Sequence, residues 1–481
     1  MNRDDAFLTD AVKRLMAYYS IPGCAMAVIE KGQVSFHTFG TRDIRSGAPF
    51  GTDTISGIGS CSKSMTVFAA ERLAERGVID LDAPIASYVP GFCLFDPLAA
   101  RMVTLRDMFC HRTGVAGHDG TWPDNSISRS DFIRRLAYLE PNAPFRTKAQ
   151  YSNVMYAAAG GILEYVTGKS WEDILHEEVF APLGMTRTVC LMKSAEGDSN
   201  CAMPHWWKGG LQAVPRWNID QAGPCGSIMS TAEDMARWLM MHIEGGTAGG
   251  KHLLAPARFL EMHTPQILMD YPHIRGGRSL GYGLGWRIME YHGHIVQQHT
   301  GKIEGYSAFQ FYLPGTGSGA VYLQNLHAPD NPFIFAIQGI LLDRFTGRPR
   351  EDWVHLYTEE RDHAPEDMYH HLEYDYTPAR HVEGTKPSHK LSDYAGVYEN
   401  GGYGRFAVTE ENGALYLAER AVTGLPLTHF HYDTFIVKGI KEDTDLYTLP
   451  VTFETGPDGT VSAMVIPMEP KTEPIRFRKR I

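Results

Sequence analysis

The sequence predicts an α+β protein in two parts: an antiparallel sheet flanked by helices with a helical subdomain, then a small C-terminal β-barrel. Strand signals stand near both ends of the first 346 residues, and the region between them is mostly helical. From Leu391 the pattern changes to short alternating strands separated by Gly-containing turns, which is typical of a small barrel or sandwich. We therefore expect a first domain over 1–346, a Pro-, His- and acid-rich linker over 347–390, and a barrel over 391–481.

The elements of the first domain follow from hydrophobic periodicity. An amphipathic helix is expected from Asp5 to Tyr19, and strands over 24–29 and 33–39 turn at Glu30-Lys-Gly32. Apolar residues at 65, 69, 70 and 73 bury one face of a helix that ends near Gly77. The remaining strands are expected over Gly281–Trp286, Ile295–Gln298, Tyr306–Tyr312 and Ala320–Gln324, followed by a helix over Pro332–Leu342. A sheet built from both chain ends, with a helical insert, accounts for this order.

The C-terminal third alternates between apolar and polar residues at strand period. The linker is expected to be partly helical over Arg350–Asp362. Beyond it, strands are expected over 396–398, 405–409, 414–417, 435–438, 446–449 and 461–466, with the motif Leu425–Asp433 lying among them.

Composition excludes several function classes. The 481 residues have an average globular composition and carry a net charge of −11, whereas a nucleic-acid partner calls for a basic face. No stretch approaches 18 consecutive apolar residues, so no membrane span is expected. The start Met1-Asn-Arg-Asp-Asp-Ala6 has no signal-peptide pattern, and seven cysteines without framework spacing suit reduced thiols. These observations predict a cytoplasmic protein.

The most informative motif is Gly59-Ser60-Cys61-Ser62-Lys63. Positions i and i+3 of a helix lie on one face, with Cβ atoms about 5–6 Å apart, so Lys63 can accept the proton of Ser60 and make it a nucleophile. The position at a helix start turns free N–H groups toward any oxyanion formed there. The alternative is that Ser60 is only an N-cap, as serines at helix starts usually are.

Two further motifs decide between these interpretations. Tyr151-Ser-Asn153 precedes a helix-like run, so the Tyr151 hydroxyl can move a proton to a leaving group while Asn153 orients the lysine or a substrate carbonyl. His299-Thr300-Gly301 ends a strand-like stretch, where Gly301 permits close approach of a substrate backbone and His299 is a titratable donor.

The order and spacing of these motifs resemble the penicillin-recognising serine hydrolases: class C β-lactamases, low-molecular-weight penicillin-binding proteins, D-amino-acid peptidases and related esterases. Four further stretches resemble segments of that family, and together the likeness covers roughly residues 5–345. These stretches are Leu105–Val115, Ala181–Met185, Gly226–Ala236 and Gly281–Trp286. The C-terminal part resembles the lipocalin-like domain attached to some of these hydrolases. Such a domain either walls the mouth of the active site or forms an oligomer contact.

The resemblance implies the β-lactamase/transpeptidase-like fold and an acyl-enzyme mechanism without cofactor or metal. Ser60 is then the nucleophile, Lys63 its base, Tyr151 the proton shuttle and Asn153 an orienting residue. The oxyanion is expected on the N–H of Ser60 and on a strand N–H near Lys302 or Ile303, with Thr300 and Gly301 beside the substrate. Many relatives carry lysine at the position of His299, which puts recognition of a free carboxylate in doubt.

Three functions stay open at this point. The favoured one is hydrolysis of an amide or peptide bond, with D-residue-containing peptides among the candidate substrates. The expected partner is a small molecule or peptide, and a homo-oligomer is one option for the assembly. The second is a carboxylesterase, or an acyltransferase or peptide cyclase that uses the same acyl-enzyme. The third is a non-catalytic scaffold. The 21 histidines form no set with Cys or carboxylate at zinc spacing, so no metal site is expected.

Overall fold

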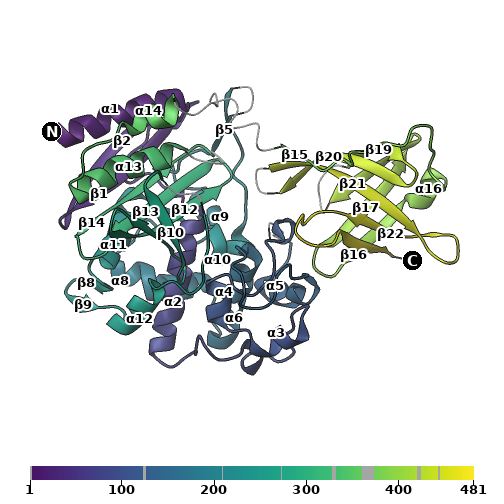
Figure 1. Cartoon of the computed structure of the whole chain (residues 1–481), viewed down its shortest axis with the longest axis horizontal. Helices are drawn as coiled ribbons and strands as arrows, with labels where there is room; N and C mark the ends of the chain where they lie inside the picture. The colour runs from purple at the N-terminus through teal and green to yellow at the C-terminus, as the bar shows by residue number, and fades with distance from the viewer. Residues whose placement is uncertain are drawn as a thin grey trace.

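The computed structural model describes residues 3–122, 126–207, 210–271, 274–327, 332–359, 373–419, 424–442 and 445–480. The first part carries an eight-stranded antiparallel sheet and the second a closed β-barrel (Figure 1), which confirms the predicted fold class. The sheet strands are β1 (Gly23–Glu30), β2 (Gln33–Asp43), β3 (Ala48–Pro49), β10 (Gly277–Tyr282), β11 (Arg287–Tyr291), β12 (His294–Ile303), β13 (Tyr306–Leu313) and β14 (Ser318–Gln324). Their order is β10-β11-β12-β13-β14-β1-β2-β3, so the two ends of the domain meet where β14 pairs with β1.

Both faces of this sheet are covered, which explains the continuous apolar run of β1. Alternate residues of β1 enter two separate core clusters: Met26 and Val28 pack in one, and Ala25 and Ala27 in the other. The first cluster includes α1 (Arg3–Tyr18), α13 (Pro332–Thr346) and α14 (Trp353–Thr358), which lie together on one face (Figure 1). In the second cluster the opposite face of the sheet packs against the helical region, so that region is supported by a sheet buried on both faces.

The helical region occupies the chain between β3 and β10. Its helices are α2 (Ser62–Glu75), α3 (Pro97–Met102), α4 (Leu105–Phe109), α5 (Arg129–Arg135), α6 (Asn153–Thr167), α7 (Trp171–Leu175), α8 (Ala181–Leu183), α9 (Met192–Ala195), α10 (Gly223–Gly226), α11 (Ala232–Ile243) and α12 (Pro256–Met262). Short strand pairs interrupt it: β4 (Ser56–Gly57) with β7 (Met229–Ser230), β5 (His205–Trp207) with β6 (Leu211–Ala213), and β8 (Thr247–Ala248) with β9 (Lys251–His252). The central helix α2 is buried along nearly its whole length.

One predicted strand is wrong. The sequence indicated a strand over Gly281–Trp286, but β10 ends at Tyr282 and the chain turns before β11 begins at Arg287. Gly285, with φ +77°, adopts the left-handed conformation of that turn. The strand expected to end at His299 instead continues to Ile303, because β13 pairs with it throughout.

The C-terminal barrel closes through a pairing of β21 with β22. Its strands are β16 (Gly396–Asn400), β17 (Gly404–Glu411), β18 (Ala414–Glu419), β19 (Leu425–His431), β20 (Thr434–Glu442), β21 (Asp445–Thr455), β22 (Val461–Ile466) and β23 (Ile475–Lys479), with α16 (Leu391–Tyr394) before them. Strands β19 and β23 were not predicted. A ninth strand, β15 (Glu373–Asp375), comes from the expected linker and runs parallel to β21. The predicted linker helix is seen as α14, and residues 360–362 of that prediction lie outside the described residues.

Within the described ranges, no helix is both long and apolar enough to cross a lipid bilayer. Seven cysteines are free thiols.

A buried histidine gives the fold a testable pH dependence. Both ring nitrogens of His242 are buried without a hydrogen-bond partner among the described residues, and the ring packs 4.3 Å from that of Trp238. Burial, with His263 nearby, holds the pKa of His242 well below its usual 6.5. The unfolded chain therefore binds a proton below pH 6.5 that the folded protein does not, so this histidine lowers stability as pH falls, by up to about 1.4 kcal/mol per pH unit.

We expect His242→Phe to reduce the drop in melting temperature between pH 7 and pH 5, measured by thermal unfolding. The exposed His252 provides the matched control, and His252→Phe is expected to leave that drop unchanged. An equal drop in the wild type and in His242→Phe would contradict this interpretation.

Candidate active site

Ser60 lies at the entry to the central helix, held against the sheet by two glycines. It is the middle residue of a 3₁₀ turn over Gly59–Cys61 that leads directly into α2. Gly59 has φ +50°, and a Cβ added there would lie 2.5 Å from the Lys302 nitrogen. A Cβ on Gly301 would lie 1.8 Å from the Ile58 carbonyl oxygen. The turn and β12 can approach this closely only because both positions are glycine.

Lys63 is fully buried and points at Ser60. Its Nζ lies 2.9 Å from Ser60 Oγ, 2.8 Å from Asn153 Oδ1 and 2.8 Å from the Cys225 carbonyl oxygen. The two carbonyl oxygens can only accept, so a neutral lysine would donate both of its N–H groups to them. Its lone pair then faces the Ser60 hydroxyl. This is the geometry of a base that takes a proton from a serine nucleophile.

Tyr151 and Asn153 flank the start of α6, and a buried histidine fixes that start. His111 Nδ1 accepts a hydrogen bond from Ser152 N at 3.1 Å, and its ring packs 4.4 Å from that of Tyr151. Burial holds the pKa of His111 well below its usual value, so the ring stays neutral. The Tyr151 ring lies 4.8 Å from Lys63 Nζ. The structure thus brings the predicted serine, lysine, tyrosine and asparagine together.

His299 lies beside the site but presents no free ring nitrogen to it. It is fully buried; Nδ1 lies 2.6 Å from the Thr300 carbonyl oxygen and Nε2 lies 2.9 Å from the Tyr282 hydroxyl. Because the carbonyl can only accept, Nδ1 carries the proton and Nε2 accepts from Tyr282. Burial and the charge of Arg287 hold the pKa of His299 well below 6.5. In this geometry His299 is a neutral support of β12 and not a cation that faces substrate.

The four β12 residues that follow His299 divide between a cavity and the core. A cavity of about 150 Å³ is lined by Ser60, Trp122, Tyr151, Asn153, Ile219, Cys225, Gly226, Arg287, Thr300 and Lys302. Gly301 and Ile303 are instead buried against the turn and in the core. Pairing of β11 with β12 stops at Gln298, so β12 residues beyond it pair only with β13 and leave one backbone edge toward the site.

Sequence reasoning missed two charged residues at this site. Arg287 lines the cavity, and its Nη1 donates to Thr300 Oγ1 at 3.4 Å. Asp119 Oδ1 accepts from Trp122 Nε1 at 2.9 Å and from Asn153 Nδ2 at 3.4 Å. Arg287 follows directly on the Gly281–Trp286 stretch that carried part of the resemblance, which was a signal for it. No local pattern marked Asp119.

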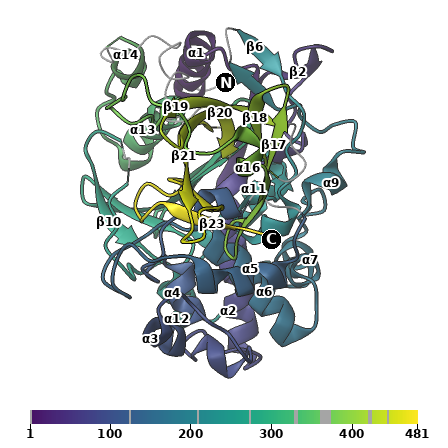
Figure 2. The same cartoon turned by 90° about the vertical axis from the view of Figure 1, so that its right-hand side faces the viewer.

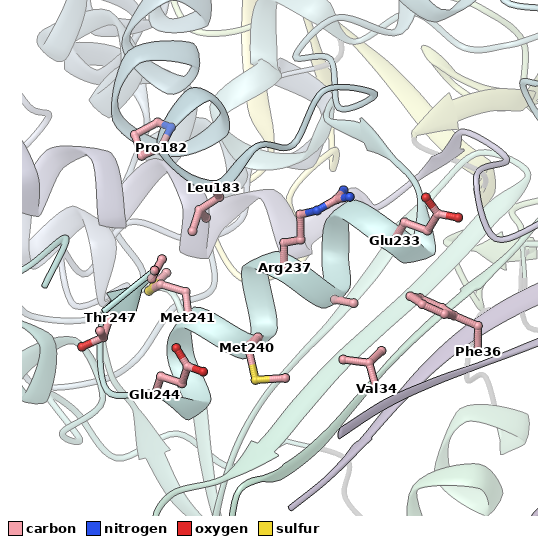
Figure 3. Close-up of a pocket in the computed structure, with 13 residues that line it drawn as sticks. Val34, Phe36, Pro182, Leu183, Glu233, Arg237, Met240, Met241, Glu244 and Thr247 are labelled. Carbon is pink, nitrogen blue, oxygen red and sulfur yellow. The ribbon is translucent and has the colours of Figure 1, made fainter. Parts of the chain in front are cut away.

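A larger cavity lies elsewhere and holds none of these residues. It measures about 550 Å³ and is bordered by α8, α11 and β2, with Val34, Phe36 and Met240 among its lining side chains (Figure 3). The chemistry-bearing residues gather in the smaller cavity, which is why we place the site there.

Other reactive groups near the site are inert or absent. Cys61 is buried, which raises the pKa of its thiol, and Sγ donates to the His299 carbonyl oxygen at 3.3 Å. In the part of the chain that the structure describes, no group of three or more His, Cys, Asp or Glu side chains could hold a metal ion. His370 and His371 lie outside those residues.

Comparison with known proteins places a chain with this fold and these contacts in a family. The Beta-lactamase family model matches residues 8–343, and a model described as a domain of unknown function (DUF3471) matches residues 380–479. The chain belongs to the Beta-lactamase family, whose members are serine hydrolases.

One relative by sequence and two solved structures are similar to this chain. Penicillin-binding protein 4 of Amycolatopsis lactamdurans is 29% identical over 332 residues, which cover 67% of this chain and 85% of that protein. The octameric penicillin-binding protein homologue from Pyrococcus abyssi is 22% identical with a TM-score of 0.62, covering 99% of this chain and 100% of that one. The D-amino acid amidase from Ochrobactrum anthropi SV3, complexed with L-phenylalanine amide, is 23% identical with a TM-score of 0.58, covering 71% of this chain and 98% of that one.

Proposed function

We propose that this protein hydrolyses amide bonds of small substrates, including D-amino acid amides or peptides, through an acyl-enzyme on Ser60. The observation that carries the proposal is the position of Lys63 Nζ, 2.9 Å from Ser60 Oγ with carbonyl oxygens on both other sides. The similarity to a D-amino acid amidase supports the substrate class.

The reaction is proposed to run in two halves. Lys63 takes the Ser60 proton as Oγ attacks the amide carbon, and the oxyanion rests on the N–H of Ser60 and a β12 N–H near Lys302. Tyr151 donates a proton to the nitrogen as the C–N bond breaks, so the amine leaves and the acyl group stays on Ser60. Water then attacks the ester and gives up its proton to the Tyr151 phenolate, and the acid leaves as the bond to Ser60 breaks and Lys63 returns the proton that it took. Ser60 regains its proton.

The wall of the cavity suits an apolar side chain on the acyl group. Trp122 and Ile219 line it, and the Trp122 ring packs 5.8 Å from that of Trp217. A flat aromatic surface next to the nucleophile would bind an apolar side chain and exclude water from it. We therefore expect phenylalanine-type amides to be better substrates than glycine amide.

A substrate panel tests the proposal. Purified protein is incubated with D- and L-phenylalanine amide, glycine amide and the corresponding methyl esters, and the released acid is quantified for the wild type and for Ser60→Ala. We expect Ser60-dependent hydrolysis of an aromatic amide. Hydrolysis of esters alone would move the function to the esterase alternative, and activity that survives Ser60→Ala would reject both.

Arg287 is proposed to bind an anionic group of the substrate, since its guanidinium lines the cavity next to Thr300. Arg287→Ala is expected to lower kcat/KM by about 10- to 100-fold for substrates with a free carboxylate near the scissile bond. For neutral amides, kcat/KM of this variant should fall by less than about threefold.

The control for this variant is Arg278→Ala on β10, whose side chain is exposed. Equal losses for anionic and neutral substrates would contradict a carboxylate-binding role.

Two further predictions accompany the proposal. A cytoplasmic location stays a prediction consistent with the free thiols. Assembly into a homo-oligomer also stays a prediction, supported by the similarity to a protein described as octameric.

A further inference from the structure

The C-terminal barrel contacts a strained turn next to the active site. It lies beside α5 in two views (Figures 1 and 2), where Gly401 packs on Tyr138. His118, fully buried, has φ +45°, a conformation that non-glycine residues hold only where their surroundings fix them. Its N–H donates to Glu469 Oε2 at 2.8 Å, and its Nδ1 lies 2.8 Å from the Tyr403 hydroxyl. Both partners belong to the barrel part of the chain.

The hydrogen bonds of His118 define its tautomer. Nε2 lies 2.9 Å from the Glu140 carbonyl oxygen, which can only accept, so Nε2 carries the proton. Burial holds the pKa of His118 below its usual value, which keeps the ring neutral. Nδ1 is therefore an acceptor, and Tyr403 is the donor to it. Replacing that hydroxyl would leave a buried acceptor without its partner.

Glu469 is itself fixed in place. It lies in the loop over 467–474 between β22 and β23 and is only 5% exposed. While Oε2 accepts from His118 N, Oε1 accepts from Lys471 N at 3.1 Å. A glutamine has one carbonyl oxygen and one NH₂ group, so it can satisfy only one of these two donors.

The turn continues directly into the catalytic group. Asp119 follows His118, and its Oδ1 accepts from Asn153 Nδ2 at 3.4 Å and from Trp122 Nε1 at 2.9 Å. Because Oδ1 accepts in both hydrogen bonds, the NH₂ side of the Asn153 amide faces Asp119. The amide oxygen then faces Lys63 Nζ, 2.8 Å away. If the amide were flipped, its NH₂ group would face Lys63 Nζ and could not accept a hydrogen bond from the lysine.

We propose that Tyr403 and Glu469 of the barrel are positioning residues for catalysis. By holding His118 they place Asp119, and through Asp119 they set the orientation of Asn153 against Lys63. The inference rests on the proposed function, since it concerns the rate at which Ser60 is acylated. It assigns the barrel a part in the active site that goes beyond a wall or an oligomer contact.

The test compares Tyr403→Phe and Glu469→Gln with matched controls from the same domain. Tyr432 is 57% exposed at the turn between β19 and β20, so Tyr432→Phe controls for the first variant, and the exposed Glu473→Gln controls for the second. The readouts are the rate of Ser60 labelling by a fluorophosphonate, followed by intact mass, and kcat and KM with an aromatic amide. We expect both variants to lose about 10- to 100-fold in labelling rate and kcat with little change in KM, and both controls to match the wild type.

A double-mutant cycle separates positioning from general stability. If Tyr403 acts through Asp119, Tyr403→Phe should slow labelling in the wild-type background and add little in an Asp119→Ala background. Thermal unfolding of each variant tests whether it stays folded at the assay temperature. The inference would be overturned if Tyr403→Phe and Glu469→Gln were labelled at the wild-type rate. It would also be overturned if Tyr403→Phe slowed labelling by the same factor in the Asp119→Ala background as in the wild type. Failure of the wild type to be labelled would instead reject the proposed function, and this inference with it.

Discussion

Lys63→Met is expected to lower kcat/KM by about 1,000-fold or more, because a positioned general base contributes on the order of 10²–10⁴. Methionine has a similar length but no group that can take the Ser60 proton. The side chain fits the site, since the rings of Tyr151 and Tyr156 lie 4.8 and 5.3 Å from Nζ and a thioether packs well on aromatic rings. Fluorophosphonate labelling and amide hydrolysis measure the loss.

The same substitution has a structural cost that must be separated from the chemical one. It leaves Asn153 Oδ1 and the Cys225 carbonyl without the lysine donor, at about 1–3 kcal/mol for the buried Cys225 acceptor. Thermal unfolding therefore accompanies the assay, with the exposed Lys169→Met as control. A stable Lys63→Met protein that keeps more than about a tenth of wild-type activity would contradict the role of Lys63 as base.

Tyr151→Phe is expected to lower kcat for amides by about 10²–10³-fold, since the phenol can no longer protonate the departing nitrogen. The ring stays in place because His111 packs on it at 4.4 Å. An activated ester such as a p-nitrophenyl ester needs little protonation of its leaving group, so its acylation should fall much less. Burst kinetics with the ester and steady-state kinetics with the amide measure this difference.

The exposed Tyr165 on α6 provides the control Tyr165→Phe. Equal losses for the amide and the activated ester would assign Tyr151 to substrate binding rather than to proton transfer.

Much of the fold could be predicted because local periodicity and tertiary burial agree. The apolar spacing after Ser60 predicted the central helix, and Lys31-Gly32 predicted the turn between β1 and β2. The failures have local causes. Within the stretch predicted as a strand over Gly281–Trp286, Gly285 makes a turn after β10 ends at Tyr282. Pro426 inside β19 is a residue that argues against a strand. Alternating Ile475 and Phe477 do mark β23, so that signal was present and was missed.

The site could be predicted in its motifs but not in its long-range contacts. Spacing along the chain predicted the serine, lysine, tyrosine and asparagine, because their chemistry depends on residue type, and the structure brings these four side chains together. The sequence did not show whether His299 faces a substrate, because that depends on Tyr282, whose hydroxyl is hydrogen-bonded to His299 Nε2. The link between His118 and Glu469 joins residues 351 positions apart and has no local pattern at either end. Only the packing of the barrel reveals it.

The central claim is that Ser60 is an activated nucleophile, and intact-protein mass spectrometry tests it most directly. Wild type and Ser60→Ala are each incubated with a fluorophosphonate and, separately, with a penicillin. We predict a single adduct on the wild type with the phosphonate and none on Ser60→Ala; a penicillin adduct in addition would show that peptide-like substrates bearing a carboxylate are accepted. An unmodified wild-type protein with both reagents, or equal labelling of Ser60→Ala, would contradict the claim.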